Sequence, residues 1–191
     1  MRCSLCFAIL VGMSQSVTIV GAGLAGSEAA LQLADRGVRV RLVEMRPKTP
    51  TLVHVTGCCA ELVCSNSLKS EKPDSAAGML KRELAELGSQ LYAQAKLHAV
   101  PAGGALAVDR TAFAEAVTAL VEAHPLIDLV HEEVVDLVQA AEGADALVVA
   151  AGPLASDALA ASLSRLAGEE HLAFYDAAAP IVTRESLDME H

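Results

Sequence analysis

Tryptophan is absent from the 191 residues, and aromatic residues make up only 3% of them. Basic residues are also few, with 14 Lys and Arg against 24 Asp and Glu, so the formal net charge is −10. Surfaces that bind nucleic acids use Lys and Arg for phosphates and aromatic rings for bases. The composition therefore argues against a strong nucleic-acid surface on this chain by itself.

Long apolar runs are missing as well. No run approaches the roughly 20 residues that a membrane-spanning helix needs, so we expect no membrane segment. The five cysteines form no paired C-x-x-C spacing of the kind that holds zinc, and we expect no metal site. Their odd number favours free thiols in a reducing compartment, which predicts a cytoplasmic location. The remaining composition, 53% hydrophobic and mostly aliphatic, is typical of an α/β domain with a substantial core.

A glycine motif follows the first β-rich run of the chain. The run Val-Thr-Ile-Val at residues 17–20 leads into Gly21-Ala22-Gly23-Leu24-Ala25-Gly26, which has the form G-x-G-x-x-G. In a dinucleotide-binding turn, the first glycine permits a tight turn, the second lets backbone approach a pyrophosphate, and the third lets the helix pack on the sheet. The N-terminus of the helix then attracts phosphate. We name residues 21–26 the glycine turn.

An acidic residue stands at the distance that this motif requires. Glu44 ends the second β-rich run, 18 residues after Gly26, where a carboxylate can accept hydrogen bonds from ribose hydroxyls. Strand, turn, helix and acid together predict a dinucleotide site rather than an ordinary glycine-rich turn. Glycine spacing alone does not distinguish FAD from NAD.

The order of the remaining segments favours FAD. We expect a helix at residues 24–36, a strand at 38–43, and then a long insertion at about 46–104. Within the insertion, the leucine spacing of residues 79–91 predicts one helix. A helix at 112–123, capped by Asp109 or Thr111, precedes β-type runs at 127–130, 133–138 and 146–150, and a helix follows at 156–166. The third run enters Gly152, which brings backbone close to a bound dinucleotide. An insertion that splits a Rossmann unit is typical of glutathione-reductase-like FAD domains.

Three segments follow from this order. We interpret residues 1–15 as an N-terminal extension, either disordered or upstream of a true start at Met13. Residues 16–152 form the predicted FAD-binding domain, a Rossmann-like α/β fold. Residues 153–191 form the start of a second, truncated domain, in which the run at 174–182 begins a new element.

Several longer motifs resemble one enzyme family. They are the glycine turn with residues 27–30, Glu44-Met45-Arg46-Pro47, Ala60-Glu61-Leu62-Val63-Cys64-Ser65-Asn66-Ser67-Leu68, and the stretches 101–110 and 174–182. Together they closely resemble the folate- and FAD-dependent tRNA (uracil-5-)-methyltransferases, from about Ser16 to Met189. The stretch around Cys64 distinguishes them from the related FAD-dependent proteins that modify the wobble uridine of tRNA.

The resemblance implies an activity and its cofactors. In this family, 5,10-methylenetetrahydrofolate donates a one-carbon unit through reduced FAD to C5 of the T-loop uridine of tRNA, and NADH or NADPH supplies electrons. Cys64 matches one of two functional cysteines and would act as nucleophile or base. The resemblance adds Arg46 to the candidate cofactor-binding residues. The full set is Gly21, Ala22, Gly23, Leu24, Ala25, Gly26, Glu44, Arg46 and Gly152.

The family's proteins are more than twice as long as this chain. We therefore expect an incomplete, inactive part of such an enzyme, with the second cysteine and most of the tRNA surface beyond His191. Two alternatives stay open, an FAD-dependent oxidoreductase or wobble-uridine modification protein and a non-catalytic nucleotide-binding remnant. A buried, inert thiol is the competing interpretation of Cys64. Helix capping competes with flavin or folate contact for Asp109 and Arg110, and core packing competes with a site role for Tyr175 and Asp176.

Overall fold

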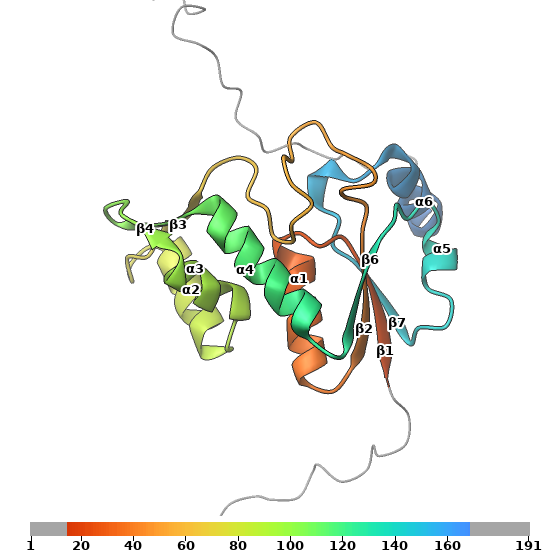
Figure 1. Cartoon of the computed structure of the whole chain (residues 1–191), viewed down its shortest axis with the longest axis horizontal. Coiled ribbons are helices and arrows are strands. Elements are labelled where there is room, and N and C mark those ends of the chain that lie inside the picture. The colour runs from red at the N-terminus through yellow and green to blue at the C-terminus, as the bar shows by residue number, and fades with distance from the viewer. Residues whose placement is uncertain (1–14, 169–191) are drawn as a thin grey trace, which may run out of the picture.

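A computed structural model describes residues 15–168 of the chain (Figure 1). The predicted extension before residue 15 and the segment 174–182, with Tyr175 and Asp176, lie outside the described residues. Within residues 15–168, no helix combines the length and the apolar character that crossing a membrane requires.

A four-stranded parallel sheet forms the centre of the molecule. Its strands, in spatial order, are β6 (Ile127–His131), β2 (Arg39–Glu44), β1 (Ser16–Val20) and β7 (Ala146–Val149). Val17 pairs with Val40 on one side and with Ala146 on the other, which sets the register of these three strands. Because all four strands run the same way, their carboxyl ends meet at one edge, where loops can build a ligand site.

Helices cover both faces of this sheet (Figure 1). On one face lie α1 (Leu24–Asp35) and α4 (Arg110–Ala123), and the main core between them includes the fully buried Ile19, Leu42 and Phe113. On the other face, α5 (Leu137–Ala140) and α6 (Asp157–Ala167) form a smaller cluster around Val20. A short 3₁₀ turn, η1 (Gly152–Leu154), joins β7 to α6. The predicted α/β Rossmann-like fold is confirmed.

A second, antiparallel sheet lies beyond α4. It consists of β3 (Ser67–Ser70), β5 (Ala105–Val108) and β4 (Ala99–Val100), in that spatial order. Two helices of the insertion, α2 (Ala76–Glu86) and α3 (Gln90–Leu97), accompany it. Glu28 of α1 fixes α3, because its carboxylate accepts hydrogen bonds from Ser89 Oγ (2.8 Å) and from the backbone N–H groups of Gln90 (3.1 Å) and Leu91 (2.9 Å).

The structure corrects two predicted elements. The single helix expected over residues 79–91 is two helices, because Gly88 takes a positive φ of 72° and the Ser89 side chain caps α3. The strand expected at 133–138 is a loop followed by α5, because the Asp136 carboxylate accepts hydrogen bonds from the N–H groups of Val138 and Gln139 and so begins a helix.

The other predicted elements are present with shifted ends. Asp109, rather than Thr111, caps α4, accepting from the backbone N–H groups of Thr111 and Ala112. Ser156 caps α6. The boundary expected near residue 153 stays a prediction, and the described part beyond it, α6, packs through Leu159 near Val20 and Leu137.

Candidate functional site

The first glycine of the glycine turn is wedged between two strand ends. Gly21 adopts a φ of +99°, and a Cβ there would lie 2.7 Å from the carbonyl oxygen of Ala150, just after β7. Its N–H donates to the carbonyl of Val43 in β2 at 2.7 Å. The positive φ and the close carbonyl both require glycine, so the turn is fixed at the carboxyl edge of the parallel sheet.

The other two glycines differ in the space around them. A Cβ on Gly26 would lie 1.8 Å from the carbonyl oxygen of Gly21, so α1 can approach the turn only if this residue is glycine. At Gly23 no atom of the described residues lies within 4 Å of such a Cβ. Gly23 is also the N-cap of α1, and no side chain within residues 15–168 caps that helix. An uncapped helix N-terminus of this kind can bind an anion.

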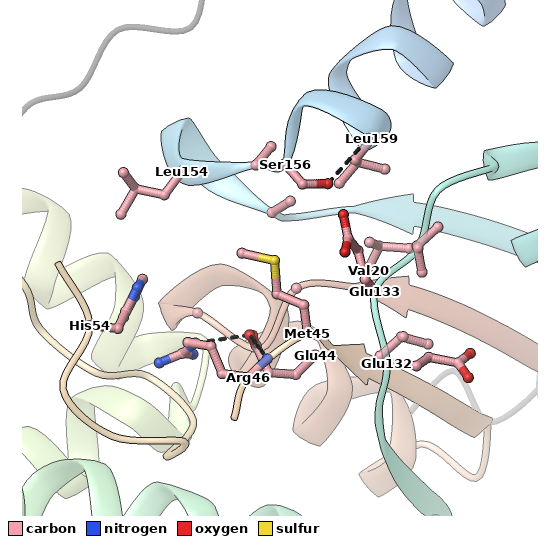
Figure 2. A pocket seen from close by; sticks show the side chains of 16 residues that line it. Val20, Glu44, Met45, Arg46, His54, Glu132, Glu133, Leu154, Ser156 and Leu159 are labelled. Carbon is pink, nitrogen blue, oxygen red and sulfur yellow. Dashed lines mark hydrogen bonds and ion pairs between the residues drawn. The ribbon is translucent and has the colours of Figure 1, made fainter. Parts of the chain in front are cut away.

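A pocket opens beside this turn, at the carboxyl ends of β1, β2 and β6 (Figure 2). It is lined by Val20, Gly21, Gly23, Val43, Glu44, Met45, Arg46, His54, Glu132, Glu133, Val134, Ala151, Leu154, Ala155, Ser156 and Leu159. Figure 2 shows His54 at one end of the pocket, with Glu132 and Glu133 toward the other. Such a position, outside the carboxyl ends of parallel strands, is where α/β proteins bind ligands.

Four of the predicted cofactor-binding residues line this pocket: Gly21, Gly23, Glu44 and Arg46. Ala22 and Gly26 are buried behind it. Leu24 and Ala25 line a different, apolar groove toward α2 and α3. Gly152 does not line the pocket, although its neighbour Ala151 does.

Glu44 is held from three sides by groups of this chain. One carboxylate oxygen accepts from the backbone N–H of Ala22 at 2.9 Å, and the other accepts from Arg46 N at 3.0 Å and Nε at 2.9 Å. Burial raises the pKa of Glu44, but the hydrogen bonds from Arg46 and Ala22 outweigh it and hold the pKa below its ordinary value. Glu44 therefore ties the glycine turn to β2. A carboxylate offers about four acceptor positions, so about one is left for the expected ribose hydroxyl.

Glu61 completes a buried ion cluster around Arg46. The Arg46 side chain is 4% exposed, and its Nη1 donates to Glu61 Oε2 at 3.1 Å. Glu61 also accepts from the N–H groups of Val55 (2.8 Å) and Thr56 (3.1 Å) and from the Thr56 hydroxyl (2.7 Å). Burial raises the pKa of Glu61, but these bonds outweigh it and lower the pKa overall. Glu61 thus holds the loop at residues 47–60 against the pocket.

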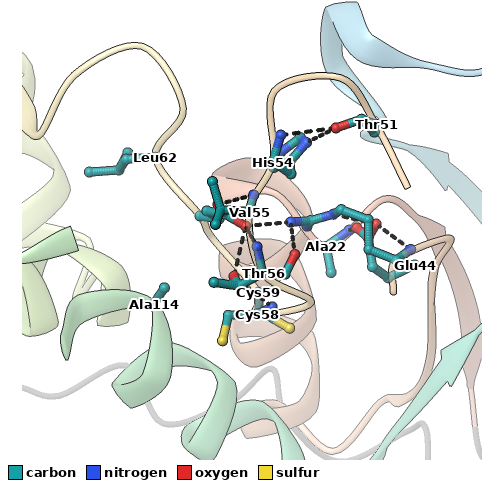
Figure 3. A network of polar contacts seen from close by, with 12 residues as sticks. Ala22, Glu44, Thr51, His54, Val55, Thr56, Cys58, Cys59, Leu62 and Ala114 are labelled. Carbon is teal, nitrogen blue, oxygen red and sulfur yellow. Dashed lines mark hydrogen bonds and ion pairs between the residues drawn. The ribbon is translucent and has the colours of Figure 1, made fainter. Parts of the chain in front are cut away.

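His54 is the residue that this loop places in the pocket. Its Nδ1 lies 2.6 Å from Thr51 Oγ1, and its backbone N–H donates to the same hydroxyl at 3.1 Å (Figure 3). Burial lowers the pKa of His54, the nearby Arg46 lowers it further, and Glu61 and Glu44 offset part of this effect. These surroundings favour the neutral form of His54.

Cys64 lies outside the pocket, exposed in the loop before β3. The hydroxyls of Ser65 and Ser67 accept hydrogen bonds from backbone N–H groups nearby, so both order this loop. Cys59 is different, because it is fully buried and burial raises the pKa of its thiol to about 11. Among the three cysteines of the described part, Cys64 is the exposed one.

The remaining candidate residues have structural contacts. Asp109 caps α4, and Arg110 Nη1 lies 3.4 Å from the carbonyl oxygen of Leu62, so neither lines the pocket. Sequence reasoning placed Gly152 near the ligand, and its neighbour Ala151 lines the pocket, but it did not single out Met45, Glu132, Glu133 or the residues at the start of α6. Nothing in the sequence spacing shows that Ser156 and Leu159 line the same pocket as Gly21 and Gly23. Glu61 belongs to the motif that contains Cys64, but nothing in the sequence indicated that it binds Arg46.

The fold and the pocket together define a Rossmann-like α/β unit with a glycine turn at the carboxyl edge of its parallel sheet. A sequence profile of the family described as "Glucose inhibited division protein A" matches residues 16–191. The chain belongs to this family.

Curated relatives are similar over almost the whole chain. The methylenetetrahydrofolate–tRNA-(uracil-5-)-methyltransferase TrmFO of Desulforudis audaxviator is 54% identical over 178 residues, which are 93% of this chain and 40% of that protein. The TrmFO proteins of Bacillus subtilis and Symbiobacterium thermophilum are 53% and 55% identical, over 92% and 91% of this chain. The chain spans about 40% of the length of these relatives.

Solved structures are less similar. The GidA-related protein from Thermus thermophilus is 24% identical, with a TM-score of 0.35, over 65% of this chain and 41% of that one. The 6-hydroxypseudooxynicotine amine oxidase from Pseudomonas geniculata is 17% identical, with a TM-score of 0.37, over 73% of this chain and 14% of that one.

Proposed function

We propose that this chain is the FAD-binding part of a folate-dependent tRNA (uracil-5-)-methyltransferase. The observation that carries the proposal is the glycine turn, with open space at Gly23 beside the uncapped N-terminus of α1. A backbone without side chains at a helix N-terminus fits a diphosphate. The high identity to proteins named TrmFO supports the reaction.

Different residues of the pocket would bind different parts of the cofactor. The N–H groups after Gly23 would bind the diphosphate, and the remaining acceptor position of Glu44 would bind a ribose hydroxyl. Arg46 would keep Glu44 ionised and in place, since it donates two hydrogen bonds to that carboxylate. FAD, when bound, would supply the carrier of the one-carbon unit. The long insertion, as in glutathione-reductase-like domains, supports FAD over NAD as the resident cofactor.

Cys64 is the proposed catalytic residue. An exposed thiol can reach a macromolecular substrate, whereas a buried thiol such as Cys59 cannot. As thiolate it would either add to C6 of the uracil, which makes C5 nucleophilic, or remove the C5 proton. We further propose methylenetetrahydrofolate as carbon donor, NADH or NADPH as reductant, tRNA as substrate and the cytoplasm as location.

Flavin titration of the purified chain tests the proposed site. We expect the wild-type chain to bind FAD and to quench its fluorescence. Gly23→Leu should weaken binding at least about tenfold, because its side chain would occupy the space of the diphosphate. Ala76→Leu, at an exposed position in the first turn of α2, is the matched control and should bind as the wild type does. Normal FAD affinity in Gly23→Leu would show that the site is assigned wrongly.

A companion experiment tests Cys64 in a full-length protein of the family that carries these residues. Cys64→Ala should leave FAD binding unchanged and abolish transfer of the one-carbon label to tRNA. Cys58→Ala, on the same connecting segment, should methylate normally. Wild-type methylation by Cys64→Ala would leave Cys64 without a catalytic role.

A further inference from the structure

The pocket has a deficit of available positive charge. Two of the side chains that line it, Arg46 and His54, can carry a positive charge, whereas three are acids, Glu44, Glu132 and Glu133. The Arg46 guanidinium already contacts two carboxylates, at 2.9 Å from Glu44 and 3.1 Å from Glu61. A dinucleotide diphosphate carries two negative charges, which the partial positive charge at the N-terminus of α1 offsets only in part, so a further cation in the pocket would strengthen binding.

His54 is placed to supply this charge. It lies in a loop whose backbone is fixed on both sides, by Thr51 before it and by the Glu61 contacts to Val55 and Thr56 after it. A ring held in this way loses little freedom on binding a ligand, so its contact is preorganised. The Nδ1 atom contacts Thr51, and Nε2 is the second nitrogen that the ring can offer to a ligand.

We propose that His54 binds the diphosphate of the dinucleotide through a charge-assisted hydrogen bond and takes up a proton as the ligand enters. This inference rests on the proposed function, because it assumes a dinucleotide in the pocket. It adds a residue that the glycine motif does not contain, contributed by the loop that Glu61 holds.

The charges around His54 set the direction of the pH dependence. Arg46, Glu61 and Glu44 are the charged groups that act on the pKa of His54, and Glu132 and Glu133 line the same pocket. Burial and Arg46 keep the pKa of His54 below 6.5 in the free protein. An adjacent dianion would raise it, and ligand affinity then increases as pH falls, by about tenfold for each unit of that rise.

Two measurements on the purified chain test the inference. Isothermal titrations with FAD at about pH 6.5, in buffers of different ionisation enthalpy, report proton uptake by the wild-type protein directly. We expect net uptake and an affinity that is several-fold higher at about pH 6 than at about pH 8. His54→Gln keeps a hydrogen-bonding group but cannot take a proton, so it should show no uptake and about tenfold weaker binding at the lower pH, with little change at the higher pH. His98→Gln, in a partly buried histidine outside the pocket, should match the wild type.

The outcomes separate the inference from the proposed function. Absence of FAD binding by the wild type at both pH values contradicts the proposed function. Normal FAD binding without proton uptake, or an unchanged pH profile in a folded His54→Gln, overturns the role of His54 alone. The wild-type uptake decides the question even if His54→Gln does not fold.

Discussion

The two sheets of this chain each carry a carboxylate cluster, and the clusters differ in burial. Beside the parallel sheet, Arg46 binds Glu44 and Glu61 with at most 10% of any of these side chains exposed. Beside the antiparallel sheet, Lys96 binds Glu71 at 3.0 Å with half of the lysine side chain exposed. Buried charges depend on their partners, whereas exposed charges can turn to water. The same ion pair chemistry therefore fixes the pocket in one region and adds little in the other.

Removing the buried cation should have the largest effect on stability. Arg46→Met leaves two buried carboxylates without a counter-ion, so we expect the free energy of unfolding to fall by about 3–5 kcal/mol. Urea denaturation of the purified chain measures this. Arg36→Met, which removes an exposed arginine at the end of α1, is the control and should change stability by less than about 0.5 kcal/mol. Equal effects of the two substitutions would mean that burial does not distinguish these arginines.

The pH dependence of stability sharpens this comparison. The pKa values of Glu44 and Glu61 lie below 4.5 in the folded chain, so their contribution is present above that pH and is lost as pH falls. In Arg46→Met, burial and the repulsion between the two carboxylates should raise both pKa values instead. Protonation of either carboxylate then removes this repulsion. We expect the wild type to lose stability as pH falls below about 5, and the variant to gain stability as pH falls from about 7 to about 5. Thermal melts across this range measure both slopes.

A steric comparison between the regions should give the next largest effect. In both α1 and α2 the third residue is glycine, and a Cβ on it would overlap a backbone oxygen, 1.8 Å from Gly21 for Gly26 and 1.9 Å from Lys72 for Gly78. Alanine in a helix is ordinarily more stable than glycine by about 1 kcal/mol. Here we expect the opposite sign, with Gly26→Ala losing about 2–3 kcal/mol of global stability.

Gly78→Ala should affect the insertion without affecting the parallel sheet. Because α2 belongs to the insertion, we expect faster hydrogen exchange in α2 while the strands of the parallel sheet keep their protection. Gly23→Ala is the control for both, because no atom in the described part of the chain lies within 4 Å of the added Cβ, and it should leave stability within about 0.5 kcal/mol of the wild type. A stabilised Gly26→Ala would contradict the packing of α1 on the turn.

This pair of glycines also shows what the sequence can reveal. Gly26 was predicted because its spacing belongs to a turn whose geometry follows from local chain order. The role of Gly78 was not predicted. It depends on the nearby carbonyl oxygen of Lys72, and no sequence pattern indicates that this oxygen lies against α2. Local rules likewise placed the strands of the parallel sheet and Glu44. The contacts of Glu61 with Arg46, and of Glu28 with the start of α3, join residues 15 and more than 60 positions apart, and tertiary packing decides them. The strand predicted at 133–138 was wrong for a local reason, since capping by Asp136 prevailed over β-propensity.

The smallest effect should come from the exposed cluster beside the antiparallel sheet. Glu71 accepts hydrogen bonds from Lys96 Nζ at 3.0 and 3.1 Å and from the Tyr92 hydroxyl at 3.1 Å. Water can replace Lys96 at this surface, so we expect Lys96→Met to lower the free energy of unfolding by only about 0.5 kcal/mol, with a smaller difference from the wild type in about 0.5 M salt, where screening weakens the pair. The measurement is urea denaturation at low and high salt. A loss that approaches the loss in Arg46→Met would show that partners, rather than burial, determine how much an ion pair contributes in this fold.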